Sequence, residues 1–389
     1  MSELNETPRG SRIHIAFFGL RNAGKSTLVN AFTGQQVAIV SDVAGTTTDP
    51  VSKAMEILPL GPCLITDTAG LDDTGALGLQ RVEKSLAVLA TTDIAVWVAA
   101  EADEASSSER RLFDETCRRR GVTVIDFRRG DSVDALKRRI ADVKLVDRQS
   151  GLLEGLVKRN DRILCIVPID ESAPKGRLIL PQQQVIRECL DIGAICTVCQ
   201  PSELLAADRS QSTAVDGRRL KPTDFDLAIT DSQAFHQIAP LFERGPRLTS
   251  FSILFARQKG DLAECVKGLE ALRELKDGDM VLIAEGCTHH RQCNDIGTVK
   301  IPKALGKLTG RELRFVFSSG NTFEIPANSR VSLVVHCGGC MLTRREVLRR
   351  IALARSAGVP IVNYGLLLAA ASGLHMSISS PEVTAQSGS

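Results

Sequence analysis

The chain has 389 residues, which is enough for two or three domains at about 150 residues each. Its 48 Lys and Arg against 46 Asp and Glu leave a net charge of +2, and it has one Trp and one Tyr. This composition argues against a nucleic-acid partner, because the chain has neither a strong positive field nor aromatic side chains on which bases could stack.

The first residues and the cysteines indicate a compartment. Residues 1–12 are polar and lack the basic-then-apolar order of a signal peptide, and no apolar run reaches the roughly 18 residues that span a bilayer. We therefore expect a disordered segment over 1–12, a cytoplasmic protein and no membrane partner. In that reducing compartment the 11 cysteines would be buried thiols, redox pairs or metal ligands, not a disulfide framework.

From residue 13 to 150, short β-branched segments alternate with helical patterns. The expected strands are 13–18, 64–66, 94–98 and 122–127, with a helix at 26–32. This alternation predicts an α/β domain with a mostly parallel sheet wrapped by helices.

A phosphate-binding loop lies between the first strand and the first helix. Residues 19–26, Gly-Leu-Arg-Asn-Ala-Gly-Lys-Ser, fit the pattern G-x-x-x-x-G-K-[ST]. The glycines let backbone N–H groups close around phosphate, the lysine reaches the β and γ phosphates, and the serine binds Mg²⁺. The expected nucleotide-binding residues in this region are Gly19, Asn22, Ala23, Gly24, Lys25, Ser26 and Thr27.

Two further segments would complete a nucleotide switch. In the Asp-Thr-Ala-Gly motif at 67–70, Asp67 would hold the Mg²⁺ shell and the Gly70 N–H would sense a γ-phosphate. The Thr-rich segment 45–49 is interpreted as a switch loop in which Thr47 binds Mg²⁺ beside Ser26 and Asp67; the alternative is an ordinary turn.

These motifs resemble the GTPases of the tRNA-modification type (TrmE/Era-like). In that group an apolar residue, here Leu71, replaces the water-orienting glutamine, and Asn22 matches an asparagine that helps to hold a potassium ion. The resemblance implies a slow GTPase that uses GTP, Mg²⁺ and K⁺. Asn22 and Thr47 are candidates for a catalytic role, and neither assignment is certain.

Base recognition departs from the usual pattern. Guanine is read by N-K-x-D after a strand, and this chain has Arg128-Arg129-Gly130-Asp131 there. Asp131 could still accept hydrogen bonds from the guanine edge, but loss of the asparagine leaves the base selectivity open.

Two more α/β domains are expected, over 158–260 and 261–389. The first has a predicted strand at 163–169, a helix at 181–190 and a closing strand at 251–256. The second has a helix-period pattern from Leu262 to Leu272, strands at 280–284 and 331–335, and a helix at 344–356. Residues from about 377 are small and polar and are expected to fray.

Metal ligands follow both strands of the last domain. Strand 280–284 leads to Cys287-Thr288-His289, and strand 331–335 leads to His336-Cys337-Gly338-Gly339-Cys340. Three thiolates leave one iron of a four-iron cluster open, and His289 or His336 is the candidate fourth ligand. From spacing alone, a zinc site with Cys₃His or Cys₂His₂ ligands is the alternative.

We call each of these two ligand segments, 287–289 and 336–340, a half-site. Together they resemble the cluster signature of the maturation GTPases of iron-only hydrogenases, the HydF family. The likeness continues in the segments 173–182, 230–235 and 363–365. It implies that Cys287, Cys337 and Cys340 bind a 4Fe-4S cluster, that 158–260 is a dimerisation domain, and that 261–389 is an iron-sulfur domain.

The resemblance also implies a function. The family holds a di-iron precursor made by two radical-SAM partners and delivers it to apo-hydrogenase, so we expect a homodimeric, GTP-binding scaffold and carrier. Three alternatives remain: an RNA-modification or ribosome-assembly GTPase with a structural zinc, a redox enzyme, and a protein whose first domain no longer hydrolyses nucleotide.

A second C-x-x-C, Cys196-Thr197-Val198-Cys199, lies within an apolar pattern. It could bind metal or form a redox pair. We expect instead that the two thiols lie at opposite or offset positions of a strand, buried as small apolar side chains.

Overall fold

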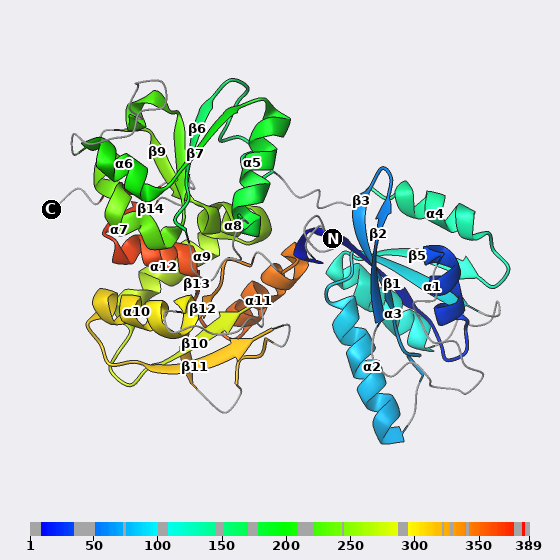
Figure 1. Ribbon diagram of the computed structural model, residues 1–389. Coiled ribbons are helices and arrows are strands. Elements are labelled where there is room, and N and C mark those ends of the chain that lie inside the picture. Colours follow the sequence, from blue (N-terminus) through cyan, green and yellow to red (C-terminus); the bar gives the residue numbers. More distant parts are fainter. Residues whose placement is uncertain are drawn as a thin grey trace. The chain divides into compact units, whose positions relative to one another are not determined.

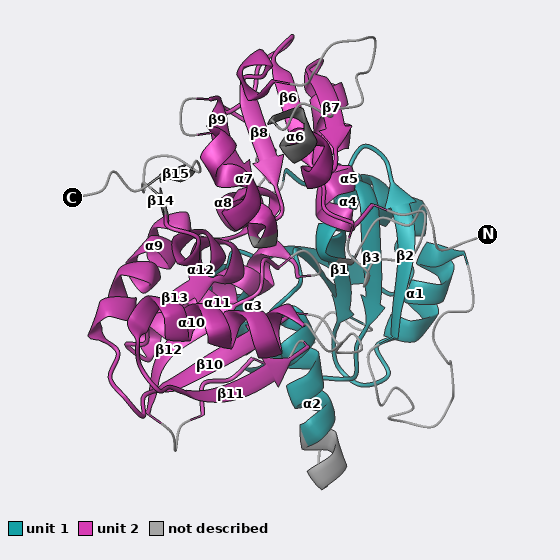
Figure 2. Ribbon diagram, turned by 60° about the vertical axis from the view of Figure 1, so that its left-hand side comes forward, with its two compact units in different colours: residues 1–148 teal, residues 149–389 magenta. Residues whose placement is uncertain are grey.

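The computed structural model describes the residues 9–34, 51–72, 75–99, 108–144, 151–169, 178–208, 221–242, 245–286, 295–320, 323–326, 330–339, 342–376 and 383–385. The chain forms two compact units, residues 1–148 and 149–389 (Figures 1 and 2). Among the described residues no helix is long and apolar enough to cross a membrane.

The first unit has a five-stranded sheet in the order β2-β3-β1-β4-β5. Its strands are β1 (Ile13–Phe18), β2 (Val51–Ile57), β3 (Gly61–Asp67), β4 (Ile94–Ala99) and β5 (Thr123–Arg128). All neighbours are parallel except β2 and β3. The predicted α/β fold with a mostly parallel sheet is thus confirmed, and β2, a largely exposed edge strand, was not foreseen.

Helices cover both faces of this sheet. They are α1 (Lys25–Thr33), α2 (Gly75–Leu89), α3 (Ser108–Arg120) and α4 (Val133–Ala141). Helices α1 and α4 pack on the face that carries Ile15 and Phe17, whereas α2 and α3 pack on the face of Phe18 and Trp97. The alternation of buried side chains along β1 therefore builds two cores from one strand.

The second unit contains two sheets, the larger in the order β14-β15-β9-β8-β6-β7. Its strands are β6 (Arg162–Ile166), β7 (Ile195–Cys199), β8 (Leu227–Thr230), β9 (Arg247–Ser250), β14 (Leu374–Met376) and β15 (Val383–Ala385). The four strands β6 to β9 are parallel, and β15 joins β9 antiparallel through Val383 and Leu248. Part of the tail that was expected to fray therefore forms a strand.

The helices of this sheet are α5 (Leu180–Ile192), α6 (Pro201–Asp208), α7 (Phe235–Ile238) and α8 (Phe251–Lys259). The strand predicted at 251–256 is wrong, because these residues form α8. Ser250 begins the helix by accepting a hydrogen bond from the Ile253 N–H at 3.2 Å. Since α8 is buried on nearly all sides, its sequence lacks the 3.6-residue period that marks a surface helix.

The smaller sheet is parallel and has the order β11-β10-β12-β13. Its elements are α9 (Leu262–Glu270), β10 (Met280–Glu285), α10 (Ile301–Thr309), β11 (Arg314–Ser319), β12 (Val331–His336), α11 (Arg344–Ser356), β13 (Ile361–Asn363) and α12 (Tyr364–Ala371). Short 3₁₀-helices lie at Arg9–Ser11, Pro222–Asp224, Ser232–Ala234, Ala239–Phe242 and Ala271–Glu274, and a π-helix spans Ile296–Lys300. Helices α9, α10 and α12 cover one face of this sheet and α11 covers the other.

One hydrophobic core joins the two sheets of the second unit. It contains Leu164 and Phe235 from the larger sheet and its helices, together with Ile283, Leu333 and Leu366 from the smaller sheet and α12. The residues from 149 onward therefore pack as one body, in which neither sheet has a core of its own on the shared side.

Candidate functional site

The phosphate loop has the backbone that its glycines allow. A β-carbon at Gly19 would lie 2.3 Å from the carbonyl oxygen of Val98, so only glycine fits between β1 and β4. Gly24, with φ +91°, caps the start of α1, and Asn22 has φ +61°. Left-handed conformations at these positions turn the chain directly from strand into helix.

Ser26 and Asp67, the two residues of the described part that the sequence analysis assigned to Mg²⁺, are in direct contact. The Ser26 hydroxyl donates to Asp67 Oδ2 at 2.6 Å, and Asp67 is fully buried at the end of β3. Asp67 Oδ1 has no hydrogen-bond partner among the described residues. Burial raises the pKa of Asp67, while the Ser26 hydrogen bond and the Lys25 charge oppose the rise. A buried carboxylate oxygen beside a hydroxyl fits a hard cation such as Mg²⁺.

The lysine of the loop is folded back onto its own backbone. Lys25 Nζ donates to the carbonyl oxygens of Gly19 at 3.3 Å and Leu20 at 2.7 Å, and the side chain is 7% exposed. These contacts keep the ammonium inside the loop, where it can exchange carbonyls for phosphate oxygens.

The Gly70 segment closes against the phosphate loop. The Leu71 N–H donates to Gly19 O at 3.2 Å, and a β-carbon at Gly70 would lie 2.8 Å from the Arg21 nitrogen. The Arg21 N–H in turn donates to Asp72 Oδ1 at 2.5 Å. Asp72 was missed by the sequence analysis, because a carboxylate just outside a motif gives no signal of its own.

The remaining nucleotide residues are placed as follows. Ala23 is buried in the loop and Thr27 is exposed on the first turn of α1. Asp131 follows β5 and accepts from the Arg128 N–H at 2.8 Å, so its carboxylate holds its own turn. Thr47 lies outside the described residues.

Both sheets with predicted ligands place them where the strand order reverses. In the first unit β1 lies between β3 and β4, and in the smaller sheet of the second unit β10 lies between β11 and β12. Open parallel sheets bind ligands outside the carboxyl ends of strands at such a switch point. The phosphate loop follows β1, and the two half-sites follow β10 and β12.

The register of β10 and β12 brings the half-sites together. Ala284 pairs with His336, and the Cys337 N–H donates to Ala284 O at 3.0 Å. The Gly286 N–H donates to Cys337 Sγ at 3.1 Å. The chain thus enters Cys287 from a residue that already contacts the Cys337 sulfur. Cys287, His289 and Cys340 lie outside the described residues.

His336 is held as a neutral imidazole. It is 2% exposed, its Nε2 lies 3.8 Å from Cys265 Sγ, and its Nδ1 has no hydrogen-bond partner among the described residues. Burial, followed by the charge of Arg350, lowers its pKa to about 4. A neutral ring with an unused nitrogen is the form that binds a metal.

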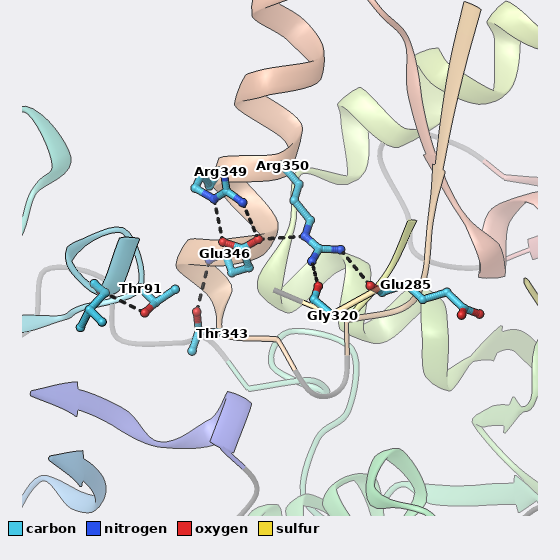
Figure 3. Close-up of polar contacts among 8 residues, drawn as sticks. Thr91, Glu285, Gly320, Thr343, Glu346, Arg349 and Arg350 are labelled. Atoms are coloured by element: carbon cyan, nitrogen blue, oxygen red, sulfur yellow. Dashed lines mark hydrogen bonds and ion pairs between the residues drawn. The ribbon is translucent and has the colours of Figure 1, made fainter. Parts of the chain in front are cut away.

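A buried arginine supports the β10 half-site from α11 (Figure 3). Arg350, 1% exposed, donates to Glu346 Oε1 at 2.9 Å and to the carbonyls of Glu285 at 3.5 Å and Gly320 at 2.6 Å. Glu346 also binds Arg349 at 2.7 and 2.9 Å, and Thr343 caps the helix. Arg350 therefore fixes the backbone two residues before Cys287.

A buried lysine supports the β12 half-site from α8. Lys259, 1% exposed, donates through Nζ to Gly339 O at 3.3 Å and Leu342 O at 2.9 Å, and it lies 5.1 Å from the Phe255 ring centre. Neither Lys259 nor Arg350 was foreseen, because Lys and Arg side chains are almost never fully buried unless they are paired.

The other C-x-x-C is divided between the two faces of its sheet, as expected. Cys199 is buried in the core shared with the smaller sheet, and Cys196 packs on the opposite face. Cys196 Sγ lies 3.7 Å from Cys165 Sγ, and hydrogen bonds from Cys165 and then Cys189 lower the pKa of Cys196 to about 4. This three-thiol group, which comes from β6, α5 and β7, was missed by the sequence analysis.

No three His, Cys, Asp or Glu side chains in the described part of the chain converge on a common metal position. Only Cys337 and His336 of the predicted cluster ligands belong to that part. Their geometry, two strand ends in register with a free imidazole nitrogen and a sulfur that accepts an N–H, fits a thiolate-bound metal or cluster.

Three family descriptions match consecutive parts of the chain. "Hydrogen maturase F dimerization domain" matches residues 152–260 and "Hydrogen maturase F tetramerization domain" matches 263–378. "50S ribosome-binding GTPase" matches residues 14–125. The chain therefore carries a GTPase domain followed by two domains of oligomerisation type.

Curated relatives match the first unit. The tRNA modification GTPase MnmE of Rhizorhabdus wittichii is 32% identical over 155 residues, which are 37% of this chain and 32% of that protein. GTPase Der of Wolinella succinogenes is 40% identical over 101 residues, which are 25% of this chain and 21% of that protein. The chain thus spans about a fifth to two fifths of the length of the curated relatives it matches.

Among solved structures, Era of Aquifex aeolicus bound to GDP.AlF4⁻ covers 79% of this chain and 92% of its own, with 18% sequence identity and a TM-score of 0.27.

Proposed function

Because this chain belongs to the hydrogen maturase F family, we propose that it is a GTP-binding scaffold and carrier in the maturation of FeFe hydrogenase. It would hold a 4Fe-4S cluster and a di-iron precursor of the active-site cluster, receive the precursor from two radical-SAM maturases, and deliver it to apo-hydrogenase in the cytoplasm. The chain has 13–150 as its GTPase domain, 158–260 as its dimerisation domain and 261–389 as its cluster domain.

The observation that carries this proposal is the contact between the half-sites. Ala284 pairs with His336, and the Gly286 N–H donates to Cys337 Sγ. These contacts bring the two ligand segments together at one switch point. Cys287, Cys337 and Cys340 bind the cluster, and His336 or His289 provides an exchangeable fourth ligand. The di-iron precursor is cargo, which the protein receives and passes on.

The nucleotide site supports a slow, switch-like GTPase. Ser26, Asp67 and Thr47 hold Mg²⁺, Lys25 reaches the β and γ phosphates, and Gly70 responds to the γ-phosphate. Leu71 provides no group that could orient water, so K⁺ beside Asn22 supplies the missing positive charge. Asp131 reads the guanine edge after it leaves its turn with Arg128.

Dimerisation occurs through the edge strand β7. At this edge of the six-stranded sheet, Ile195 and Val198 are 55% and 45% exposed, which is unusual for large apolar side chains on a strand. Pairing with β7 of a second copy would cover both residues and extend the sheet through backbone hydrogen bonds.

The deciding experiment is anaerobic reconstitution followed by iron and sulfide analysis and electron paramagnetic resonance. We expect about four irons per chain, with a cubane signal lost in Cys337→Ser and kept in Cys196→Ser. Zinc without sulfide, or iron that is indifferent to Cys337, would disprove the scaffold proposal and favour an RNA-associated GTPase with a structural zinc.

The nucleotide half of the proposal is tested separately. Lys25→Met should weaken binding of a GTP analogue with Mg²⁺ by about 10- to 150-fold, the range for loss of a hydrogen bond to a charged group. Lys144→Met, at an exposed position of the same unit, should not change the affinity. Equal affinities for Lys25→Met and the parent in calorimetry would exclude this site.

A further inference from the structure

We infer that Lys259 is a positioning residue of the cluster site, whose buried positive charge stabilises the negative charge of the bound cluster. This inference rests on the proposed function, because it assumes that Cys337 and Cys340 hold the cluster. It assigns a role to a residue of α8, outside the region that carries the three cysteines.

The geometry places the ammonium at the loop of the second half-site. Lys259 Nζ donates to the carbonyl oxygens of Gly339 and Leu342, one residue before Cys340 and two residues after it. The side chain is 1% exposed and lies against the Phe255 ring, so its position is fixed by packing on all sides. Few rotamers are open to a lysine held in this way.

The positive charge of Lys259 should affect the reduction potential of the cluster. A four-iron cluster with three thiolate ligands is an anion, and reduction adds one more negative charge. A buried ammonium nearby favours the reduced form, because water screens the interaction far less than at the surface. Removal of the charge should therefore make the cluster harder to reduce.

Arg350 provides a contrast within the same site. Its guanidinium binds the carboxylate of Glu346 and shares it with Arg349, so this positive charge is partly neutralised where it lies. Lys259 Nζ contacts the backbone on both sides of Cys340, whereas Arg350 contacts the backbone before Cys287. Lys259 is thus the buried cation that contacts the predicted C-x-x-C loop itself, and it is the one expected to act on the potential of the cluster.

The test compares Lys259→Gln and Lys259→Arg in the full chain after anaerobic reconstitution. Glutamine keeps an N–H donor for the loop carbonyls and removes the charge, whereas arginine keeps the charge. At a fixed potential we expect the ratio of reduced to oxidised cluster to fall at least tenfold in Lys259→Gln, which is about 59 mV for a one-electron couple. Lys259→Arg should stay within about threefold of the parent.

Lys267→Gln is the matched control, because it makes the same substitution in the same unit on a lysine that is 63% exposed. It should not change the ratio. Iron content and circular dichroism show whether each variant is folded and loaded. A loaded Lys259→Gln protein with the parental ratio would overturn the inference, as would equal shifts in Lys259→Gln and Lys267→Gln. Parent protein without iron would instead refute the proposed function.

If Lys259→Gln does not retain a cluster, Lys259→Arg decides alone. A folded Lys259→Arg protein that holds iron with the parental ratio supports the role of charge. One that holds iron with a ratio at least tenfold lower shows that the shape of lysine matters and refutes it.

Discussion

The two C-x-x-C segments of this chain have the same spacing and different structures. Cys196 and Cys199 lie inside β7, where residues three apart face opposite sides of the sheet. Cys337 follows the end of β12, and the chain turns at Gly339 with φ +68° before it reaches Cys340. Two cysteines of a C-x-x-C segment can bind the same metal ion or cluster only when the chain between them leaves the strand.

The C-x-x-C spacing alone does not identify the neighbours of either cysteine pair. In β7 the partner thiols of Cys196 are Cys165 and Cys189, which the sequence separates from it by 31 and 7 positions. After β12, the partners of Cys337 come from the neighbouring strand end. In both segments the sheet, and not the motif, selects the neighbours.

The largest expected effect comes from Arg350, which supports the strand end of β10 beside the Cys337–Cys340 segment. Arg350→Met removes the buried partner of Glu346 and of two backbone carbonyls, and should lower the free energy of unfolding of the second unit by about 3–5 kcal/mol. Arg349→Met, at a side chain that is 28% exposed, should cost about 1 kcal/mol or less. Urea denaturation measures both, and similar losses would contradict the assignment of Arg350 as the main support.

Substitutions in the two C-x-x-C segments should have opposite effects on stability and on iron binding. Cys199→Ser buries a hydroxyl in an apolar core and should cost about 1–3 kcal/mol while iron binding is retained. Cys337→Ser, at a half-buried position where the hydroxyl can accept the Gly286 N–H, should cost about 0.5 kcal/mol and abolish iron binding. Denaturation of the apo-proteins and iron analysis of the reconstituted proteins give the two readouts; loss of iron in both variants would contradict the distinction.

The turn between Cys337 and Cys340 can be tested with adjacent glycines. Gly339→Ala places a β-carbon in a left-handed conformation, 3.0 Å from Val347 Cγ2, and should cost about 1–2 kcal/mol and weaken iron retention. Gly338→Ala is the control, since its β-carbon would meet Ser252 at 3.5 Å, an ordinary contact. If both substitutions have equal effects on thermal unfolding and iron retention, the turn at Gly339 is not what matters.

The smallest expected effect is on the reactivity of Cys196 in the β7 segment. Because the pKa of Cys196 is lowered to about 4, its thiolate persists as the pH falls, and alkylation by iodoacetamide should change little from about pH 8 to about pH 5. An ordinary thiol loses about tenfold per pH unit in this range. Burial raises the pKa of Cys199 to about 12, so it should react slowly throughout.

Peptide mass spectrometry after timed alkylation measures each rate, and Cys165→Ala is the matched variant. It removes the sulfur that lies 3.7 Å from Cys196 Sγ and is the main cause of the lowered pKa of Cys196, and it should restore a strong pH dependence. A Cys196 rate that already falls tenfold per pH unit in the parent would show that the three thiols do not act together.

Much of the fold and of the nucleotide site could be predicted, because the determining signals are local. Glycines that must adopt left-handed backbone, as Gly24 does, and a serine one residue after the loop lysine define the phosphate loop from eight consecutive residues. The apolar strand before Asp67 likewise predicts that its carboxylate lies at the carboxyl end of a buried strand.

The rest depended on contacts between distant segments. The strand predicted at 251–256 was wrong because burial on all sides removes the helical period from α8. Lys259 and Arg350 could not be foreseen, since only the packing of α8 and α11 against the β10 and β12 ends buries their charges. The register that joins the half-sites likewise follows from the crossover between β11 and β12.

The hydrophobic core shared by Leu164 and Ile283 also decides where this chain can be divided and recombined. The two hydrogen maturase F matches meet between residues 260 and 263, but a cut there would split one core and separate β15 from β9. A GTPase module taken from a relative should instead be joined near residue 148, where the two compact units meet along the chain. Chimeras made at that position would keep the whole of the second unit as one transferable part.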